Sequence, residues 1–167
     1  MAPSITMAIP NFLSARKVNL ACPYFMPITK IENGNWPHPA RLPLGCGWNG
    51  HCTAPGHENQ TPAQNILEAF CNLGYASSCG WTPPQRQWDA IRFAVTAPGG
   101  RDNAKAAIDP QARVLRLNYI CERDNRPVNH GELAYDVSLA MWLNPHADAR
   151  IQKMAECFLE SYWKKKA

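Results

Sequence analysis

Cysteine is the residue type in this chain whose number and placement point most directly to chemistry. The chain of 167 residues contains seven cysteines. Two lie in the second half, Cys121 and Cys157, and the first half holds the other five: Cys22, Cys46, Cys52, Cys71 and Cys79. Thiolates bind soft metal ions and iron–sulfur clusters, and they also form disulfides. The five N-terminal cysteines are therefore the first candidates for a binding site.

A [4Fe-4S] cluster is the cofactor that we expect first. Such a cluster is held by four thiolates that approach from different sides, and wide spacings such as that between Cys52 and Cys71 allow this. Cys22 precedes a proline, as one cluster ligand of bacterial ferredoxins does. Glycines beside Cys46 and Cys79 leave backbone amides free to bond sulfur atoms. We predict that the cofactor and its metal are bound by Cys22, Cys52, Cys71 and Cys79.

The choice between Cys46 and Cys52 is close. Cys71 and Cys79 form a pair at the end of a predicted helix and in the loop after it, and Cys22 precedes the glycine-rich loop. One place then remains for two cysteines. We select Cys52, and we treat Cys46, which lies between two glycines, as a near neighbour or an alternative ligand.

Three other interpretations of the five cysteines stay open. Zinc ranks second: structural zinc sites commonly use Cys-x(2–4)-Cys pairs, and the chain has no CxxC. Cys46, Cys52 and His57 nevertheless offer two sulfur atoms and one nitrogen in one loop, and Cys71 or Cys79 would complete a tetrahedron. A disulfide framework is disfavoured by the odd number of cysteines and by the lack of an export signal. In the last interpretation the thiols are small buried side chains.

Composition and charge exclude several classes of protein. No apolar run reaches the 18 residues that suggest a membrane-spanning helix. No basic residue precedes the apolar N-terminal stretch, which argues against a secretory signal and favours the cytoplasm. The net charge of +4 is a mild bias, so it does not favour a nucleic-acid partner, although it leaves one open.

The chain length favours a single domain, residues 1–167, with an α+β fold. We expect a small antiparallel β-sheet with packed helices and an irregular, cysteine-rich and Pro/Gly-rich N-terminal half. Residues 16–82 form the cysteine-rich metal- or cluster-binding region of this domain, and residues 85–167 form a hairpin plus helices.

The period of the apolar residues predicts the individual elements. A helix is expected over residues 61–73, with Thr61 as its cap and Pro62 in its first turn. Alternating apolar residues predict strands at 88–96 and 113–122 that pair as an antiparallel hairpin. A charged, turn-rich segment is expected at 122–131, followed by a short strand at 131–135. A short helix is expected at 136–143. After a cap at Asn144, an amphipathic helix is expected from 151 onward.

The remaining cysteines and the tryptophans have simpler expected roles. Cys121 lies on the apolar side of a predicted strand, so it is expected to be a small core residue. Cys157 is expected to project away from the apolar stripe of the last helix. Four tryptophans lie near the cysteines in sequence and are expected to cover the cofactor and exclude water from it: Trp36, Trp48, Trp81 and Trp88.

The function expected from these residues is electron transfer or redox sensing by a small iron–sulfur protein, with a redox protein as its partner. The alternative is a zinc-stabilised module that binds a protein or a nucleic acid. No Ser/His/Asp or Cys/His arrangement is recognisable from the spacing. Whether the chain is an enzyme therefore stays open.

Overall fold

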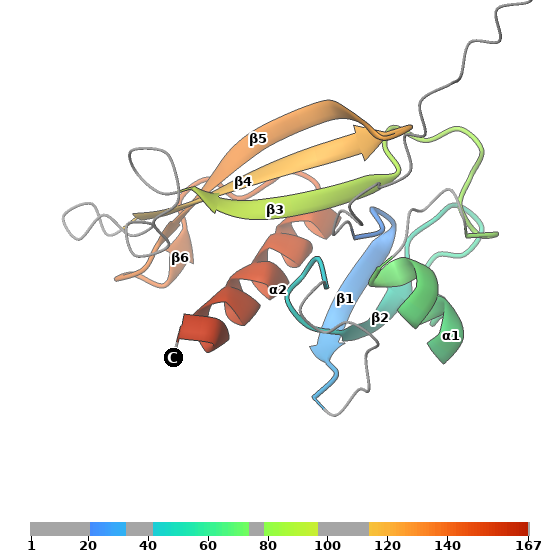
Figure 1. Cartoon of the computed structure of the whole chain (residues 1–167), viewed down its shortest axis with the longest axis horizontal. Helices are drawn as coiled ribbons and strands as arrows, with labels where there is room; N and C mark the ends of the chain where they lie inside the picture. Colours follow the sequence, from blue (N-terminus) through green and yellow to red (C-terminus); the bar gives the residue numbers. More distant parts are fainter. Residues whose placement is uncertain (1–20, 33–41, 74–78, 97–113, 167) are drawn as a thin grey trace, which may run out of the picture.

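The computed structural model describes residues 21–32, 42–73, 79–96 and 114–166 (Figure 1). These residues form two antiparallel β-sheets and two helical segments, so the fold is mixed α+β. The elements are, in order, β1 (Phe25–Lys30), β2 (Trp48–Cys52), α1 (Gln64–Ile66), the π-helical segment η2 (Leu67–Cys71), β3 (Ala90–Thr96), β4 (Val114–Arg123), β5 (Arg126–Asp136), β6 (Met141–Trp142) and α2 (Ala149–Lys166).

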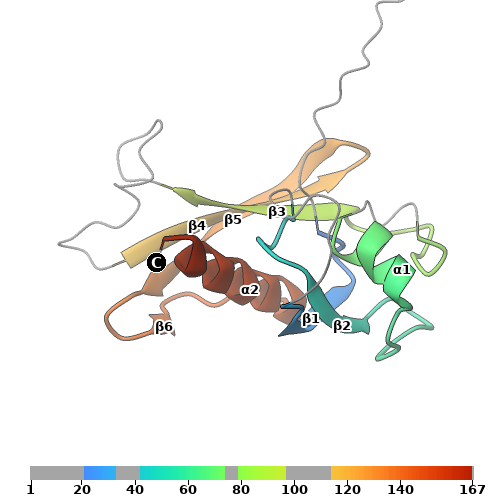
Figure 2. The ribbon, with the colours of Figure 1, turned by 60° about the horizontal axis from the view of Figure 1, so that its bottom comes forward.

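The larger sheet has the strand order β3-β4-β5-β6, and α2 lies across one of its faces (Figures 1 and 2). Every second side chain of β4 from Leu115 to Cys121 is buried, while Arg116 is exposed. Because successive side chains of a strand point to opposite faces, this alternation turns one side of β4 toward α2. Leu117 and Cys121 share one apolar core with Met154 of α2.

The predicted hairpin of the second half is confirmed, and the sheet is larger than expected. β3 pairs antiparallel with β4, with Ile91 opposite Cys121. The segment predicted to be turn-rich, 122–131, belongs to β4 and β5 instead. The two strands are joined at Asp124 and Asn125, whose φ angles are 50° and 60°. Two positive φ angles in succession are typical of the tight turn that fits the twist of paired strands.

The helix predicted at 136–143 is wrong. A carboxylate oxygen of Asp136 accepts hydrogen bonds from the amides of Ser138 and Leu139, which stabilises a turn in place of a helix. The chain then returns as β6, which pairs with β5. The cap of the last helix also differs, because Asp148 accepts the amide of Arg150 at 2.9 Å and so caps α2.

Cys157 is buried, contrary to the sequence prediction, with 2% of its surface exposed. The cause is that α2 contacts two layers. One side packs on the larger sheet, and another packs on the N-terminal half, where Cys46 lies against the same core as Cys157. A single apolar stripe therefore underestimates the buried surface of this helix. Cys121 is fully buried, as predicted for a core residue.

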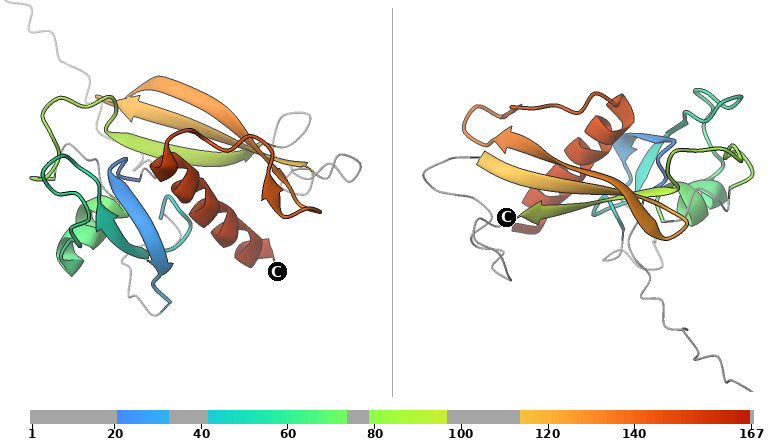
Figure 3. Two further views of the ribbon diagram at one scale, coloured as in Figure 1. Left: turned by 180° about the vertical axis from the view of Figure 1, so that it is seen from behind. Right: turned by 90° about the horizontal axis from the view of Figure 1, so that it is seen from above.

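The second sheet, which the sequence did not reveal, consists of β1 and β2. Phe25 lies opposite Cys52, and the register shifts between Pro27 and Thr29. β2 reads WNGHC and lacks the alternation that identifies strands. A Cβ atom on Gly50 would lie 2.0 Å from the Met26 carbonyl oxygen, so this close strand approach requires glycine. Figure 3 shows both sheets and α2 from behind and from above.

The helices of the described part of the chain include none of the length and apolar character needed to span a bilayer.

Gly131 provides a test of the packing of the larger sheet. A Cβ atom at this position would lie 2.5 Å from the Tyr119 hydroxyl oxygen, which is 3.1 Å from Nε2 of His146. We expect Gly131→Ala to displace the Tyr119 ring and to lower the free energy of unfolding by about 1–3 kcal/mol, as overpacking does. Urea denaturation measures this change. Gly80→Ala, where a Cβ would meet no atom within 4 Å, should change it by less than about 0.5 kcal/mol; equal effects would contradict the packing argument.

Candidate metal centre

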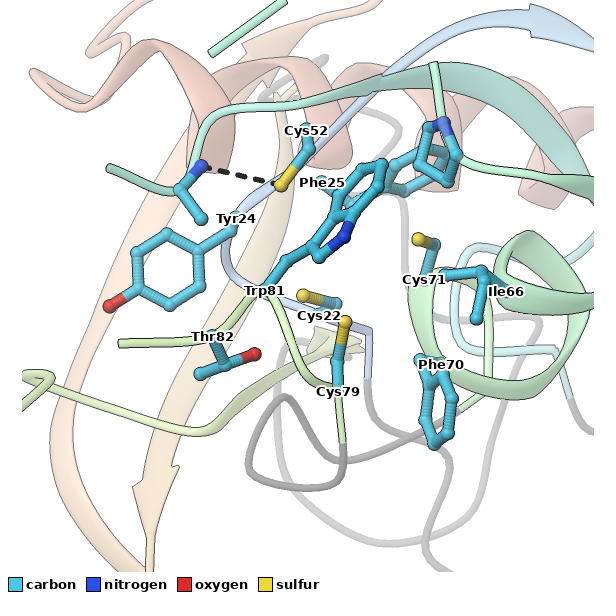
Figure 4. Close-up of a pocket in the computed structure, with 12 residues that line it drawn as sticks. Cys22, Tyr24, Phe25, Cys52, Ile66, Phe70, Cys71, Cys79, Trp81 and Thr82 are labelled. Carbon is cyan, nitrogen blue, oxygen red and sulfur yellow. Dashed lines mark hydrogen bonds between the residues drawn. The ribbon is translucent and has the colours of Figure 1, made fainter. Parts of the chain in front are cut away.

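One cavity brings together four cysteine side chains from separate segments of the chain (Figure 4). Cys22 precedes β1, Cys52 ends β2, Cys71 ends η2, and Cys79 lies in the loop before β3. These are the four residues predicted from the sequence as cofactor ligands. The enclosed part of the cavity measures about 10 Å³, and the rest is an open mouth. The rest of its wall is mainly apolar and aromatic: Tyr24, Phe25, Ala54, Pro62, Ile66, Phe70, Trp81 and Thr82.

Cys22 is positioned by backbone bonds to two other elements. The preceding residue, Ala21, exchanges two hydrogen bonds with Ile91 of β3, of 2.8 and 3.0 Å. The amide of Cys22 itself donates to the Cys71 carbonyl oxygen at 3.3 Å. Two predicted ligands are therefore joined directly through the backbone, and Cys22 is tied to the edge of the larger sheet.

Cys52 is held by the loop that follows it. Its amide donates to the Gln60 carbonyl oxygen at 2.8 Å, and its own carbonyl oxygen accepts from the Asn59 amide at 2.9 Å. Asn59 has a φ of 62°, a conformation that asparagine adopts more readily than most residues. The loop thus closes on Cys52, and its neighbour Thr53 donates to the Tyr24 carbonyl oxygen from both its amide and its hydroxyl group.

Cys71 ends a helix that starts later and winds more widely than predicted. The predicted cap at Thr61 is wrong, because Ala63 occupies the N-cap position with no side-chain hydrogen bond. The last turn is π-helical, and the Asn72 amide donates to the Leu67 carbonyl oxygen at 3.0 Å. Such turns are frequent at functional sites. Cys71 itself is buried, with 7% of its surface exposed.

Asn72 fixes this helix end to β2, and sequence reasoning missed it. Its side-chain oxygen accepts the Trp48 amide at 2.9 Å, and its side-chain nitrogen donates to the carbonyl oxygens of Trp48 at 3.0 Å and Leu67 at 3.1 Å. The residue is only 2% exposed. The one signal in the sequence is a polar residue that directly follows a cysteine at the end of an apolar helix face.

Cys79 is the least enclosed of the four cysteines. It is half-buried, whereas Cys22, Cys52 and Cys71 are buried. Its carbonyl oxygen accepts the Thr82 amide at 3.0 Å and so starts a turn. Residues 74–78, which lie between Cys71 and Cys79 in the sequence, are outside the described residues.

Cys46 and His57, the other candidate ligands, have different surroundings. Cys46 does not line the cavity; its sulfur lies 3.2 Å from the Ser161 hydroxyl oxygen on α2. The ring of His57 stacks on Trp81, with ring centres 4.5 Å apart and planes 5° from parallel. The structure therefore does not bring Cys46 to the cavity as the mixed zinc site would require.

The four tryptophans expected to cover the cofactor differ in where they lie. Trp81 lines the cavity, and in the view of Figure 4 its indole crosses the space among the four cysteines. Trp48 and Trp88 contribute instead to the neighbouring apolar core. Trp36 lies outside the described residues.

Burial and proximity set the charge state of the thiols. Burial raises the pKa of Cys22 to about 12; amide hydrogen bonds from Tyr24 and Phe25 oppose this rise, and the thiols of Cys52 and Cys79 add to it. Burial also raises the pKa of Cys71, and the other three thiols of the cavity raise it further. Four thiolates could not share this cavity without a cation to balance their charge.

Two of the sulfur atoms already have backbone amide donors. The Ala54 amide lies 3.4 Å from the Cys52 sulfur, and the Tyr24 amide bonds the Cys22 sulfur. In both cases the donor comes two residues after the cysteine. Amide bonds of this kind stabilise a thiolate and tune the metal that it binds.

The spacing of the cavity does not suit one small ion. Among the described residues, no three His, Cys, Asp or Glu side chains converge closely enough to hold a single metal ion. In a tetrahedral zinc site with Zn–S bonds of about 2.3 Å, the sulfur atoms lie about 4 Å apart. The thiolates of a four-iron cluster bind different iron atoms and stand farther apart. As they stand in the described part of the chain, the thiols therefore do not form a site for a single zinc ion.

Comparisons of the chain with protein-family models, with curated proteins and with solved structures found no match. The chemistry of the site therefore follows from its own residues.

Asn72 provides a test of how the helix end is held. We expect Asn72→Ala to leave backbone groups of Trp48 and Leu67 without partners and to lower the free energy of unfolding by about 2–3 kcal/mol. Urea denaturation of metal-free protein measures this. The control is Asn129→Ala on exposed β5, for which a change below about 0.5 kcal/mol is expected. A similar loss in both variants would show that Asn72 has no special role.

The core thiols outside the cavity predict a pH dependence of stability. Burial raises the pKa of Cys121 to about 11 and that of Cys157 to about 12. Unfolded thiols ionise near pH 8.5, so above that pH the unfolded chain binds fewer protons than the folded chain. Stability should fall as pH rises from about 8.5 to 11, by at most about 1.4 kcal/mol per pH unit for each thiol, and should be insensitive to these groups below that range.

The matched variant for this test is Cys157→Ala, which removes one of the titrating thiols. Urea denaturation of metal-free, reduced protein across this pH range should give a shallower decline for the variant than for the parent chain. Parallel declines would contradict the assignment of a raised pKa to Cys157.

Proposed function

We propose that this chain is a small iron–sulfur protein that holds a [4Fe-4S] cluster through Cys22, Cys52, Cys71 and Cys79. The observation that supports this most strongly is the meeting of these four thiols at one cavity, although up to 57 positions separate them in the sequence (79 − 22). All seven cysteines are free thiols in the structure. Four free thiols directed from different segments toward one space match the ligand requirement of this cluster.

The wall of the cavity supports a cluster in a second way. Its aromatic and aliphatic side chains limit the access of water, and a low local polarity is one of the factors that set a cluster's reduction potential. The amides that bond Cys22 and Cys52 would stabilise the negative charge that the thiolates carry once the metal binds. Both features support the proposal of a site that exchanges electrons.

When bound, the cluster would supply reversible one-electron chemistry. The role of the chain is to position the four sulfur atoms and to shield the cofactor. We therefore propose electron transfer or redox sensing, with a redox protein as partner. Free thiols persist in a reducing compartment, in keeping with the cytoplasmic location expected from the sequence. We further propose that the cluster orders the Pro/Gly-rich loops of the N-terminal half.

Anaerobic preparation followed by metal analysis tests this function. We expect brown protein with iron and acid-labile sulfide each at about four per chain. Each of the three buried cysteines supplies one of the four ligands, so Cys22→Ala, Cys52→Ala and Cys71→Ala should each lose most of the iron and the visible absorption. Iron analysis and the absorption spectrum of each variant are the measurements.

The matched control is Cys46→Ala, which removes a thiol from the same half of the chain but outside the cavity. This variant should keep the full iron and sulfide content of the parent chain. Full cofactor in the Cys71→Ala variant, or loss of iron in Cys46→Ala alone, would contradict the ligand set. Colourless protein with one tightly bound zinc would instead favour the binding module stabilised by a structural metal.

A further inference from the structure

We infer that Cys79 is the ligand at which the cluster opens, so that a small one-electron oxidant releases the iron atom bound to this sulfur before any other. This inference rests on the proposed function and makes it more specific, because a cluster with one vulnerable corner responds to oxidants. It favours redox sensing over electron transfer between fixed partners.

The four sulfur ligands differ in how well they are enclosed. Three of them belong to the core of the protein, with exposed fractions of 7% for Cys22, 8% for Cys52 and 7% for Cys71. Cys79 is half-buried. The site therefore has three enclosed ligands and one that solvent reaches. The reactivity of a thiolate toward oxidants follows its exposure.

The space next to Cys79 is open as well. The following residue, Gly80, is exposed, and a Cβ atom there would meet no other atom within 4 Å. A small molecule can therefore approach the chain at this position without displacing a side chain. Trp81, whose ring stacks on His57, covers the next part of the cavity wall.

The backbone bonds that the described part of the chain shows also differ among the four cysteines. Cys22 and Cys71 are bonded to each other, and Cys52 is bonded through both its amide and its carbonyl group. In the described part of the chain, Cys79 is held through one turn bond from Thr82. Local opening takes place where backbone bonds are few and solvent-exposed, so the bonds of Cys22, Cys52 and Cys71 favour these three ligands staying in place.

The charges of this step would balance. A [4Fe-4S] cluster of charge 2+ would give one electron to the oxidant as the bond between the Cys79 sulfur and its iron breaks. One Fe²⁺ ion would leave, and a three-iron cluster of charge 1+ would remain on Cys22, Cys52 and Cys71. The Cys79 sulfur would take up a proton from solvent and become a free thiol. Alkylation of that free thiol would identify the cysteine that released its iron.

The test uses the full chain with its cluster, prepared without oxygen. One equivalent of ferricyanide is added, iodoacetamide follows, and mass spectrometry then locates the alkylated cysteines. We expect one Fe²⁺ released per chain, the electron paramagnetic resonance signal of a three-iron cluster, and labelling of Cys79 at least about tenfold above that of the three enclosed ligands, since oxidation and alkylation follow exposure. Cys46, which is free before and after oxidation, is the internal reference.

The outcomes separate this inference from the function on which it rests. Protein that binds no iron and has no visible absorption would overturn the proposed function itself. A cluster that loses iron with equal labelling of all four ligands, or with first labelling of another cysteine, would overturn only the assignment of Cys79. So would a cluster that is oxidised without losing iron.

Two variants provide an independent check by a structural readout. Cys79→Ala should retain a three-iron cluster, visible by electron paramagnetic resonance, because its three enclosed ligands are intact. Cys71→Ala should retain none. If both variants lose the cluster completely while their circular dichroism stays that of folded protein, Cys79 is no more dispensable than Cys71 and the inference fails.

Discussion

Backbone hydrogen bonds at two consecutive residues, Ala21 and Cys22, join the parts of this protein. Ala21 pairs with Ile91 at the edge of the larger sheet, and Cys22 bonds the carbonyl group of Cys71 at the end of η2. Because these residues also lead into β1, the two sheets and the helix end meet at one short stretch of chain. The cavity forms at this meeting point, so its geometry depends on how both sheets are placed.

The same junction explains why three of the four thiols are buried and the fourth is half-buried. Cys22, Cys52 and Cys71 belong to paired or helical backbone, and such backbone is buried with its polar groups satisfied. Asn72 satisfies the buried groups of Trp48 that the β1–β2 pair leaves unpaired. Cys79 comes from a turn outside this network. The difference in exposure among the four thiols is thus a consequence of topology, and it does not require any special chemistry at Cys79.

Sequence patterns predicted the elements whose apolar residues alternate or repeat regularly. They failed where tertiary contacts determine burial or strand pairing. The β3–β4 hairpin followed from the alternation of Leu115, Leu117 and Tyr119. The same rules misplaced Cys157, because a helix between two layers buries more than one stripe. The four candidate ligands could be chosen from their surroundings in the sequence, but their meeting at one cavity could not be derived from spacing. It depends on the β1–β2 pair, whose strand WNGHC carries no recognisable pattern.

The wide separation of the four cysteines has a consequence for the order of events during synthesis. A short Cys-x-x-Cys loop can capture metal while most of a chain is still unfolded, because its ligands are neighbours and closing the loop costs little entropy. Here the cysteines meet only after β1, β2, η2 and the edge of β3 have come together. Contacts between such distant segments form late in folding. A cluster bound by these thiols, as we propose, would therefore enter a site whose strands and helix end have already come together.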